Sequence, residues 1–266
     1  MKMDTPGLVV TEKRVGDTDR LVTVLTRERG ILRAFVRRAG RGAGGRLSAT
    51  RLFTYSRLSI FEGRSSYIID DAQPIEVFFG LGKDIGRLSL AQYFCELAVA
   101  LAPQGENAGR FLRLMLNALY FLARGDRPAA PIKAAVEMRI MTLAGYQPDL
   151  VCCAGCGRYE AETMFFLPRE GKLLCGGCFR PQERPGPAFA LNGGALAALR
   201  HTVYADFEKL FSFRVSGEAQ RQLSAAAEGY VLETLGRGFG TLDFYHRMTR
   251  PGADAGETKP GERPAT

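Results

Sequence analysis

Residues 27–64 read RERGILRAFVRRAGRGAGGRLSATRLFTYSRLSIFEGR, a stretch in which arginines alternate with aromatic, branched and glycine residues. It holds ten arginines and two acidic residues, Glu28 and Glu62, so its excess of +8 equals the formal net charge of the whole 266-residue chain. Alternation with a period of two is typical of half-buried β-strands. The stretch therefore predicts β-structure with one basic side open to solvent, because unpaired charge is costly to bury.

The rings in this stretch fall on the same side as the arginines, most clearly over residues 51–61. Guanidinium groups neutralise phosphates, and an exposed ring that stacks on a base contributes about 1–3 kcal/mol. We therefore expect neighbouring strands to present one outward side that binds DNA, through Arg33, Arg37, Arg38, Arg41, Arg46, Arg51, Arg57, Phe53 and Tyr55. The alternative is a barrel whose arginines are only hydrated and whose rings belong to its core.

Five strands are expected around this stretch, at residues 8–15, 20–26, 31–38, 51–61 and 66–72. Their short turns and one longer basic loop at residues 39–45 fit a small closed antiparallel barrel of the OB type within residues 1–80. An SH3-like barrel has a similar strand count, so the pattern leaves that alternative open.

The hydrophobic period becomes helical after Pro74. Helices are expected at residues 85–102, 107–123 and 131–144, and then at 193–204, 206–213, 217–235 and in a short closing segment that ends at residue 248. These segments form a helical domain in two parts, residues 81–148 and 183–248. Residues 249–266 are rich in Pro, Gly, Glu and Lys and predict a disordered tail.

Residues 149–182, between the two helical parts, contain paired cysteines. Cys153 and Cys156 are followed after eighteen residues by Cys175 and Cys178, and this spacing is typical of four-thiolate zinc sites. The intervening residues 163–167 and 172–174 are expected to form a hairpin. The four cysteines predict one structural zinc ion per chain, and Cys152 is left out because it would give the less usual C-x3-C turn.

Several other functions find no support in the sequence. The glycine-rich segment from Gly40 to Gly45 lacks the lysine and the Ser/Thr of a P-loop, and no nucleophile has a base beside it, so no enzyme is expected. The sequence has no run of about 18 apolar residues, so no membrane span is expected. With no apparent signal peptide, the protein is expected in the cytoplasm, where thiols stay reduced.

The order of these parts resembles the bacterial recombination mediator family RecO. The resemblance rests on the opening residues 9–22, the strand at residues 21–26, residues 145–150 before the first cysteine pair, residues 166–171 before the second, and residues 230–232 and 242–245 near the end. It covers residues 8–248. It implies an α+β multidomain chain with an N-terminal OB-fold barrel and a helical domain that carries the zinc-binding hairpin.

The resemblance also implies a function in DNA repair at the nucleoid. Members of that family bind single- and double-stranded DNA, anneal complementary strands, contact single-strand-binding protein, and work with RecR to help load RecA in the RecF pathway. The alternative from the residues alone is a zinc-ribbon module that binds RNA or bridges proteins in transcription or translation. An enzyme that acts on a phosphorylated substrate is a third possibility.

Overall fold

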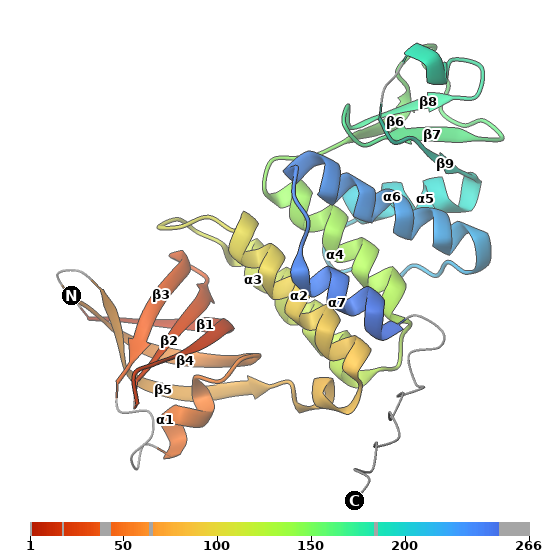
Figure 1. Ribbon diagram of the computed structural model, residues 1–266. Helices are drawn as coiled ribbons and strands as arrows, with labels where there is room; N and C mark the ends of the chain where they lie inside the picture. Colours follow the sequence, from red (N-terminus) through yellow and green to blue (C-terminus); the bar gives the residue numbers. More distant parts are fainter. Residues whose placement is uncertain (1, 18, 38–43, 64–65, 184–185, 250–266) are drawn as a thin grey trace, which may run out of the picture.

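The structure, a computed structural model, describes residues 2–17, 19–37, 44–63, 66–183 and 186–249. Two of the expected DNA contacts, Arg38 and Arg41, and the expected tail beyond Thr249 lie outside these residues. A β-barrel, a helical body and a small second sheet follow one another from one end of the molecule to the other (Figure 1).

Five strands close into the barrel: β1 (Lys2–Val15), β2 (Asp19–Thr26), β3 (Gly30–Val36), β4 (Thr54–Glu62) and β5 (Tyr67–Val77). Their order is β1-β2-β3-β5-β4, and β4 pairs with β1 to complete the ring. A short helix, α1 (Gly44–Ala49), lies between β3 and β4 and packs on β4 and β5. This arrangement confirms the predicted OB-type barrel over the SH3-like alternative.

Alternation along β3 places apolar side chains inside the barrel. Leu32, Ala34 and Val36 are buried in the barrel core, whereas Arg33 between them is exposed. Gly30 begins the strand with φ +60, and a Cβ there would lie 1.9 Å from the carbonyl oxygen of Pro103. Only glycine fits such a turn, because it has neither the steric penalty at positive φ nor the side chain.

The connection between β3 and β4 differs from the prediction. Helix α1 was not expected, and β4 begins at Thr54, three residues later than the strand expected at residues 51–61. Phe53 has φ +62, and its N–H donates to the carbonyl oxygen of Val9 at 3.0 Å. The period-two pattern therefore does not extend back to Arg51, because a residue with positive φ interrupts the extended backbone.

The helical body contains α2 (Ile85–Leu101), α3 (Gly109–Arg124), α4 (Ala129–Leu143), α5 (Gly193–Tyr204), α6 (Gly217–Leu235) and α7 (Gly240–Thr249), with short 3₁₀ turns η1 (Phe79–Lys83) and η2 (Pro181–Glu183). None of the helices in the described part is long and apolar enough to cross a membrane. The prediction of a helix at residues 206–213 is wrong. These residues form turns, and Leu210 and Phe211 anchor them in the core.

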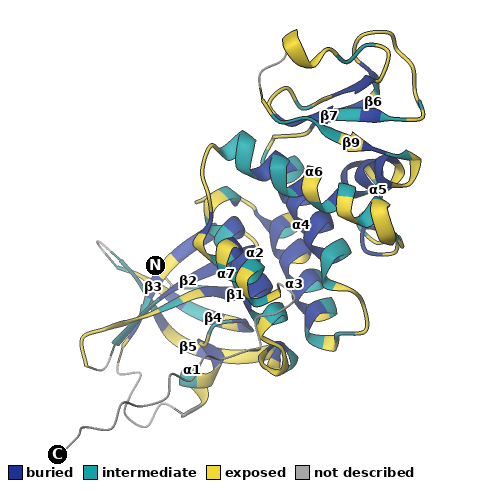
Figure 2. Cartoon of the chain, turned by 45° about the vertical axis from the view of Figure 1, so that its right-hand side comes forward, coloured by how far each residue is buried: buried dark blue, intermediate teal, exposed yellow. Residues whose placement is uncertain are grey.

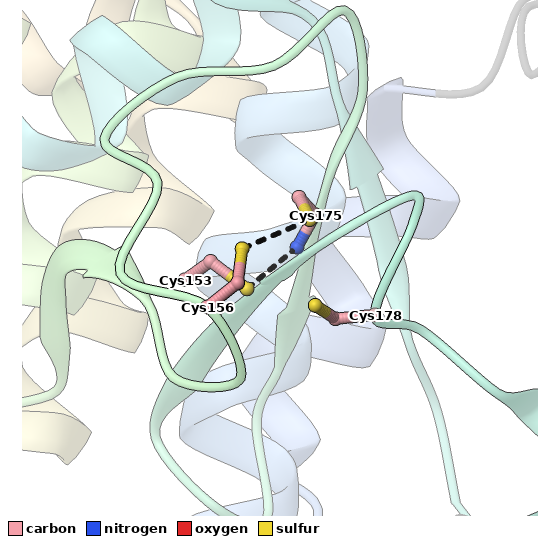
Figure 3. A group of neighbouring side chains, drawn as sticks. All are labelled: Cys153, Cys156, Cys175 and Cys178. Atoms are coloured by element: carbon pink, nitrogen blue, oxygen red, sulfur yellow. Dashed lines mark hydrogen bonds between the residues drawn. The ribbon is translucent and has the colours of Figure 1, made fainter.

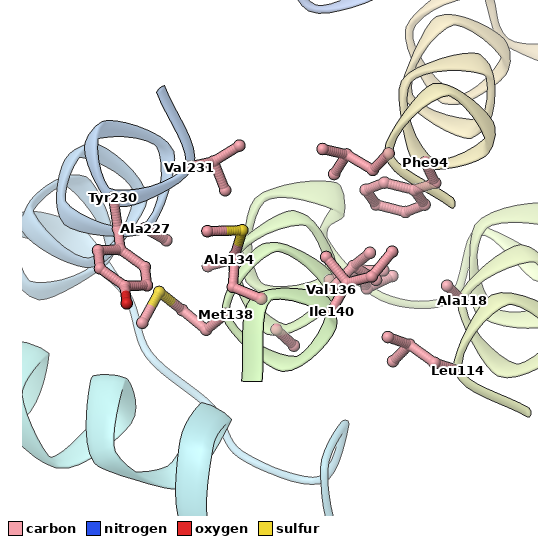
Figure 4. Packing of buried hydrophobic residues seen from close by; sticks show 14 of the residues in the cluster. Phe94, Leu114, Ala118, Ala134, Val136, Met138, Ile140, Ala227, Tyr230 and Val231 are labelled. Carbon is pink, nitrogen blue, oxygen red and sulfur yellow. The ribbon is translucent and has the colours of Figure 1, made fainter. Parts of the chain in front are cut away.

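Helix α4 is the centre of the helical body and packs on α2, α3, α5 and α6. Figure 4 shows its side chains Ala134, Val136, Met138 and Ile140 meeting residues from several of these helices. Apolar residues occur on all sides of α4, as expected of a helix that is covered on every side. Its buried Lys133 is compensated because its Nζ lies 2.7 Å from carboxylate oxygens of both Glu137 and Glu228.

The barrel and the helices share one hydrophobic cluster. Leu8, Leu25 and Ile31 of the barrel belong to the same cluster as α2 and α3, and buried residues occur on both sides of the junction (Figure 2). The main chain bridges the junction as well, because Ile31 N–H donates to Pro103 O at 2.9 Å and Ala108 N–H donates to Arg27 O at 2.7 Å. One side of the barrel is therefore covered by the helices.

The second sheet consists of β6 (Asp149–Cys153), β7 (Met164–Leu167), β8 (Lys172–Cys175) and β9 (Phe189–Leu191), in the order β6-β8-β7-β9. Strands β7 and β8 pair from Met164 with Cys175 to Leu167 with Lys172, which confirms the predicted hairpin. Strands β6 and β9 were not expected. Each is short, and their pairing partners lie elsewhere in the sequence.

Candidate metal centre and nucleic-acid interface

Four cysteines meet at one end of the second sheet. Cys153 ends β6 and Cys175 ends β8, and the two strands are parallel neighbours, so both sulfurs emerge at the same edge. Cys156 and Cys178 follow three residues later, each in a turn. The four Sγ atoms all lie within 4.8 Å of one another, and Cys156 Sγ is 3.7 Å from Cys175 Sγ (Figure 3).

The geometry fits a tetrahedral metal ion. With metal–sulfur bonds of about 2.3 Å, the sulfurs of a four-thiolate site lie about 3.8 Å apart. The prediction that these four cysteines could hold a metal ion is confirmed. Cys152 does not belong to the group, although it precedes Cys153 in the same strand.

Main-chain donors favour the thiolate form of Cys153. Burial of this side chain raises its pKa, but N–H groups of Cys175, Gly155 and Cys156 donate to the sulfur and lower the pKa to about 6. The bond from Cys175 N–H to Cys153 Sγ measures 3.2 Å. A thiolate prepared in this way binds a cation without first losing a proton at neutral pH.

Gly155 is a site residue that the cysteine pattern does not reveal. A Cβ at this position would lie 3.0 Å from both Cβ and Sγ of Cys178. We expect Gly155→Ala to displace that sulfur and to weaken metal binding by roughly tenfold, as changes around metal ligands commonly do.

Competition of the purified protein with a chromophoric chelator, with zinc as the probe, measures this effect. Gly193→Ala is the matched control, because a Cβ there has no neighbour within 4 Å. Equal zinc affinity of the two variants would contradict the assigned close approach.

Arg200 of α5 ties the metal-bearing sheet to the helices. Its guanidinium donates to the carbonyl oxygens of Leu150 at 2.7 Å, Val151 at 2.9 Å and Tyr159 at 2.6 Å, and it lies 3.9 Å from the centre of the Tyr159 ring. The side chain is buried, and Glu160 forms an ion pair with it at 3.6 Å. The sequence shows no sign of this role, because the contacted carbonyls are 41 or more residues away.

We expect Arg200→Met to destabilise the protein by about 3 kcal/mol, because it leaves buried carbonyls without their donor. Arg200→Lys should have a stability between those of the wild type and Arg200→Met, since one ammonium group cannot make all the hydrogen bonds of the planar guanidinium. Urea unfolding followed by circular dichroism measures the loss. The control is Arg221→Met on α6, whose side chain is 71% exposed. A loss no larger than that of the control would contradict the role.

The barrel arginines are mostly exposed. Arg33, Arg37, Arg51 and Arg57 are exposed, and none of them forms an ion pair with another residue that the structure describes. Arg46 is half-buried and donates to the carbonyl oxygen of Asp70 at 2.8 Å. The described arginines therefore keep most of their charge available to an anion.

The arginines do not all lie on neighbouring strands, and this part of the prediction is wrong. Arg33 is on β3 and Arg57 is on β4, and β5 lies between these strands in the closed sheet. Strand β3 meets β5 at Tyr67 and Ile68, whereas Arg57 is opposite Gln73. Strand order depends on long-range pairing, and it places Arg33 and Arg57 apart on the barrel with β5 between their strands.

The two expected stacking rings are not freely exposed. Phe53 is buried in the cluster shared with the helices, because its positive φ turns it away from the direction that alternation predicts. Its expected exposure is a wrong prediction. Tyr55 is half-buried and packs on the same cluster, although it is on the outward face of β4.

Comparison with known proteins adds an independent observation. Residues 1–78 match the family profile described as recombination protein O N terminal, and residues 82–243 match the profile described as recombination protein O C terminal. A DNA repair protein RecO from Symbiobacterium thermophilum is 31% identical over 90% of this chain and 94% of its own length. Another from Acetivibrio thermocellus is 29% identical over 93% of this chain and 98% of its own length. With profiles that together match most of its length, the chain belongs to the RecO family of DNA repair proteins.

Proposed function

We propose that the protein is a recombination mediator that binds single- and double-stranded DNA, promotes strand annealing and helps to load RecA in RecF-pathway repair. Its action would place it at the nucleoid, in the cytoplasm. The proposal is supported by family membership and above all by one observation, the exposed barrel arginines that form no ion pair with another described residue. We also propose that it acts without a catalytic reaction of its own.

The position of Arg33 and Arg57 on different, non-adjacent strands would give annealing a physical basis. Two DNA strands repel each other until their phosphates are neutralised, and arginines on β3 and β4 would hold one strand each. Arg33 on β3 and Arg37 just after it would hold the first DNA strand, and Arg57 on β4 would hold the second. Arg38, Arg41, Arg46 and Arg51 would add to these contacts, and Tyr55 is the remaining candidate for a ring contact. Neutralising both strands on one barrel lowers the repulsion that opposes pairing.

Annealing of complementary strands precoated with single-strand-binding protein is the direct test. The protein should accelerate duplex formation, and the acceleration should fall steeply with salt because phosphate contacts release counterions. Matched DNA and RNA competitors distinguish this function from RNA binding. Preference for RNA together with no acceleration of annealing would reject the proposal.

We propose zinc as the ion of the four-cysteine site, one per chain, held by Cys153, Cys156, Cys175 and Cys178. Zinc would supply folding free energy to the small sheet and no reaction chemistry, because four protein ligands leave no open position. Metal analysis of protein purified without chelators tests this assignment. A different metal, or a zinc content far below one per chain, would reject it.

We propose that the protein works with RecR and single-strand-binding protein and, through them, with RecF and RecA. Family membership supports these partners. Pull-down of each purified partner, with and without single-stranded DNA, tests them individually.

A further inference from the structure

A groove of about 770 Å³ lies where the barrel meets the helices. It runs between the end of β2, the outward face of β4, the first turns of α3, helix α4 and the turn after α5. We name it the seam groove and define it by six lining residues: Arg27, Tyr55, Arg110, Arg113, Arg139 and Phe207. Both parts of the chain are needed to form it.

The seam groove is strongly basic. Four arginines line it against a single carboxylate, that of Asp206. Arg27 and Arg110 are exposed and form no ion pair with any residue in the described part of the chain. Arg113 pairs with Glu208 at 2.8 Å, but that pair is largely exposed and therefore weak. A concave surface with this excess of positive charge attracts anions more strongly than a flat one.

One of the four arginines is buried. Arg139 is 4% exposed, and its guanidinium donates to the carbonyl oxygens of Thr202 at 3.0 Å and Ala205 at 2.7 Å, at the end of α5. Burial lowers the pKa of Arg139, and repulsion from Arg110 lowers it further. Repulsion between two positive charges held at fixed positions is relieved when an anion binds between them.

The beginning of α3 adds donors to the same surface. Gly109 and Arg110 line the groove, and the preceding residue, Ala108, has no side chain that could cap the helix. Gly109 N–H already donates to Asn107 Oδ1 at 3.0 Å. The N–H groups that follow it in the first turn have no partner within the helix, and together with the helix dipole they favour a phosphate. The arginines and this helix terminus therefore line the same surface.

Aromatic rings in the groove, and a surface that continues onto the barrel, indicate which anion the groove fits. Tyr55 lines the groove, and Arg57 lies two residues further along the same outward face of β4. The Phe207 ring has the guanidinium of Arg113 4.9 Å and that of Arg139 5.8 Å from its centre. Basic side chains interleaved with rings are typical of surfaces that hold single strands.

We propose that the seam groove binds the sugar-phosphate backbone of single-stranded DNA as the strand passes from the barrel onto the helical body. This inference rests on the proposed DNA-binding function. The strand would contact Arg27, Arg110 and Arg113 directly, whereas Arg139 raises the local potential and positions the turn after α5.

The test is the double variant Arg27→Gln/Arg110→Gln, which removes two exposed charges. Each lost phosphate contact reduces the salt slope for a single strand by about 0.7, so the variant should bind an oligothymidine of about 30 nucleotides about 20-fold more weakly at roughly 0.1 M salt. Binding of an oligothymidine of about 8 nucleotides, which one OB-type barrel can hold, should weaken less than about threefold. Fluorescence anisotropy at several salt concentrations measures both.

The matched control is Arg221→Gln/Arg237→Gln, which removes two exposed charges near α6. It should not detectably change the binding of either oligothymidine. If the groove variant binds the long strand like the wild type while barrel variants lose binding, the groove proposal is overturned and the proposed function stands. If both kinds of variant keep full affinity, both proposals fail. Loss of binding to a poly-glutamate peptide with unchanged DNA binding would assign the groove to an acidic protein segment and overturn the proposal.

Discussion

Cys175→Ser is expected to release the metal ion and unfold the second sheet. Cys175 is buried at the end of β8 and contributes both its sulfur and the N–H bond to Cys153. Structural zinc provides folding free energy directly, and the apparent binding free energy in small zinc modules is roughly 10–16 kcal/mol. The main hydrophobic cluster includes Met164, Phe166 and Leu173 of this sheet. Unfolding of the sheet will therefore also remove packing contacts from α5 and α6.

A decrease in the thermal midpoint of at least about 10 °C is expected, since about 1 kcal/mol shifts a domain of this size by about 2–4 °C and loss of only a fraction of that binding free energy is enough. Scanning calorimetry and metal analysis are the measurements. Cys152→Ser is the control, because this residue precedes Cys153 but is not in the group of four. Retention of one equivalent of metal and an unchanged midpoint in Cys175→Ser would refute the assigned ligand set.

Arg33→Gln/Arg37→Gln/Arg57→Gln is expected to cause the largest loss of DNA binding. These side chains are exposed and without ion pairs among the described residues, so neutralising them should cost little stability. Three lost phosphate contacts reduce the salt slope for a single strand by about 2, which corresponds to about a 100-fold loss of affinity near 0.1 M salt.

Anisotropy titrations across a salt series measure the affinity and the salt slope. The rate of strand annealing should decrease together with the affinity. The matched control is Arg158→Gln/Arg221→Gln/Arg237→Gln, which removes the same charge from exposed positions outside the barrel. A wild-type slope in the barrel variant, or an equal loss in the control, would show that net charge and not this surface governs binding.

The parts of the fold that the sequence predicts are those determined by local pattern. Leu32, Ala34 and Val36 alternate because the barrel has an inside and an outside, and Gly30 stands where the backbone must turn at positive φ. The cysteine spacing identifies the metal site because two C-x2-C turns place their sulfurs together with little help from the rest of the chain.

The parts of the fold that the sequence does not predict depend on contacts between residues far apart in the chain. Residues 206–213 have enough apolar side chains for a helix, yet Leu210 and Phe211 use them to anchor turns. The separation of Arg33 from Arg57 follows from the position of β5, which alternation within one strand does not reveal. The role of Arg200 depends on carbonyls that tertiary packing brings to it from residues 41 or more positions away, so it has no local signature in the sequence.

The junction between barrel and helices has a consequence for how the protein meets its partners. Ile31 and Ala108 join the two parts through their main chains, and the close approach of Gly30 to Pro103 allows no side chain between them. If the protein binds DNA as proposed, a molecule braced in this way would hold the strand and any protein docked on its helices at one spacing and one angle. Transfer of DNA to another protein would then proceed by movement of the strand or of the partner, because the barrel and the helical body would keep their relative position.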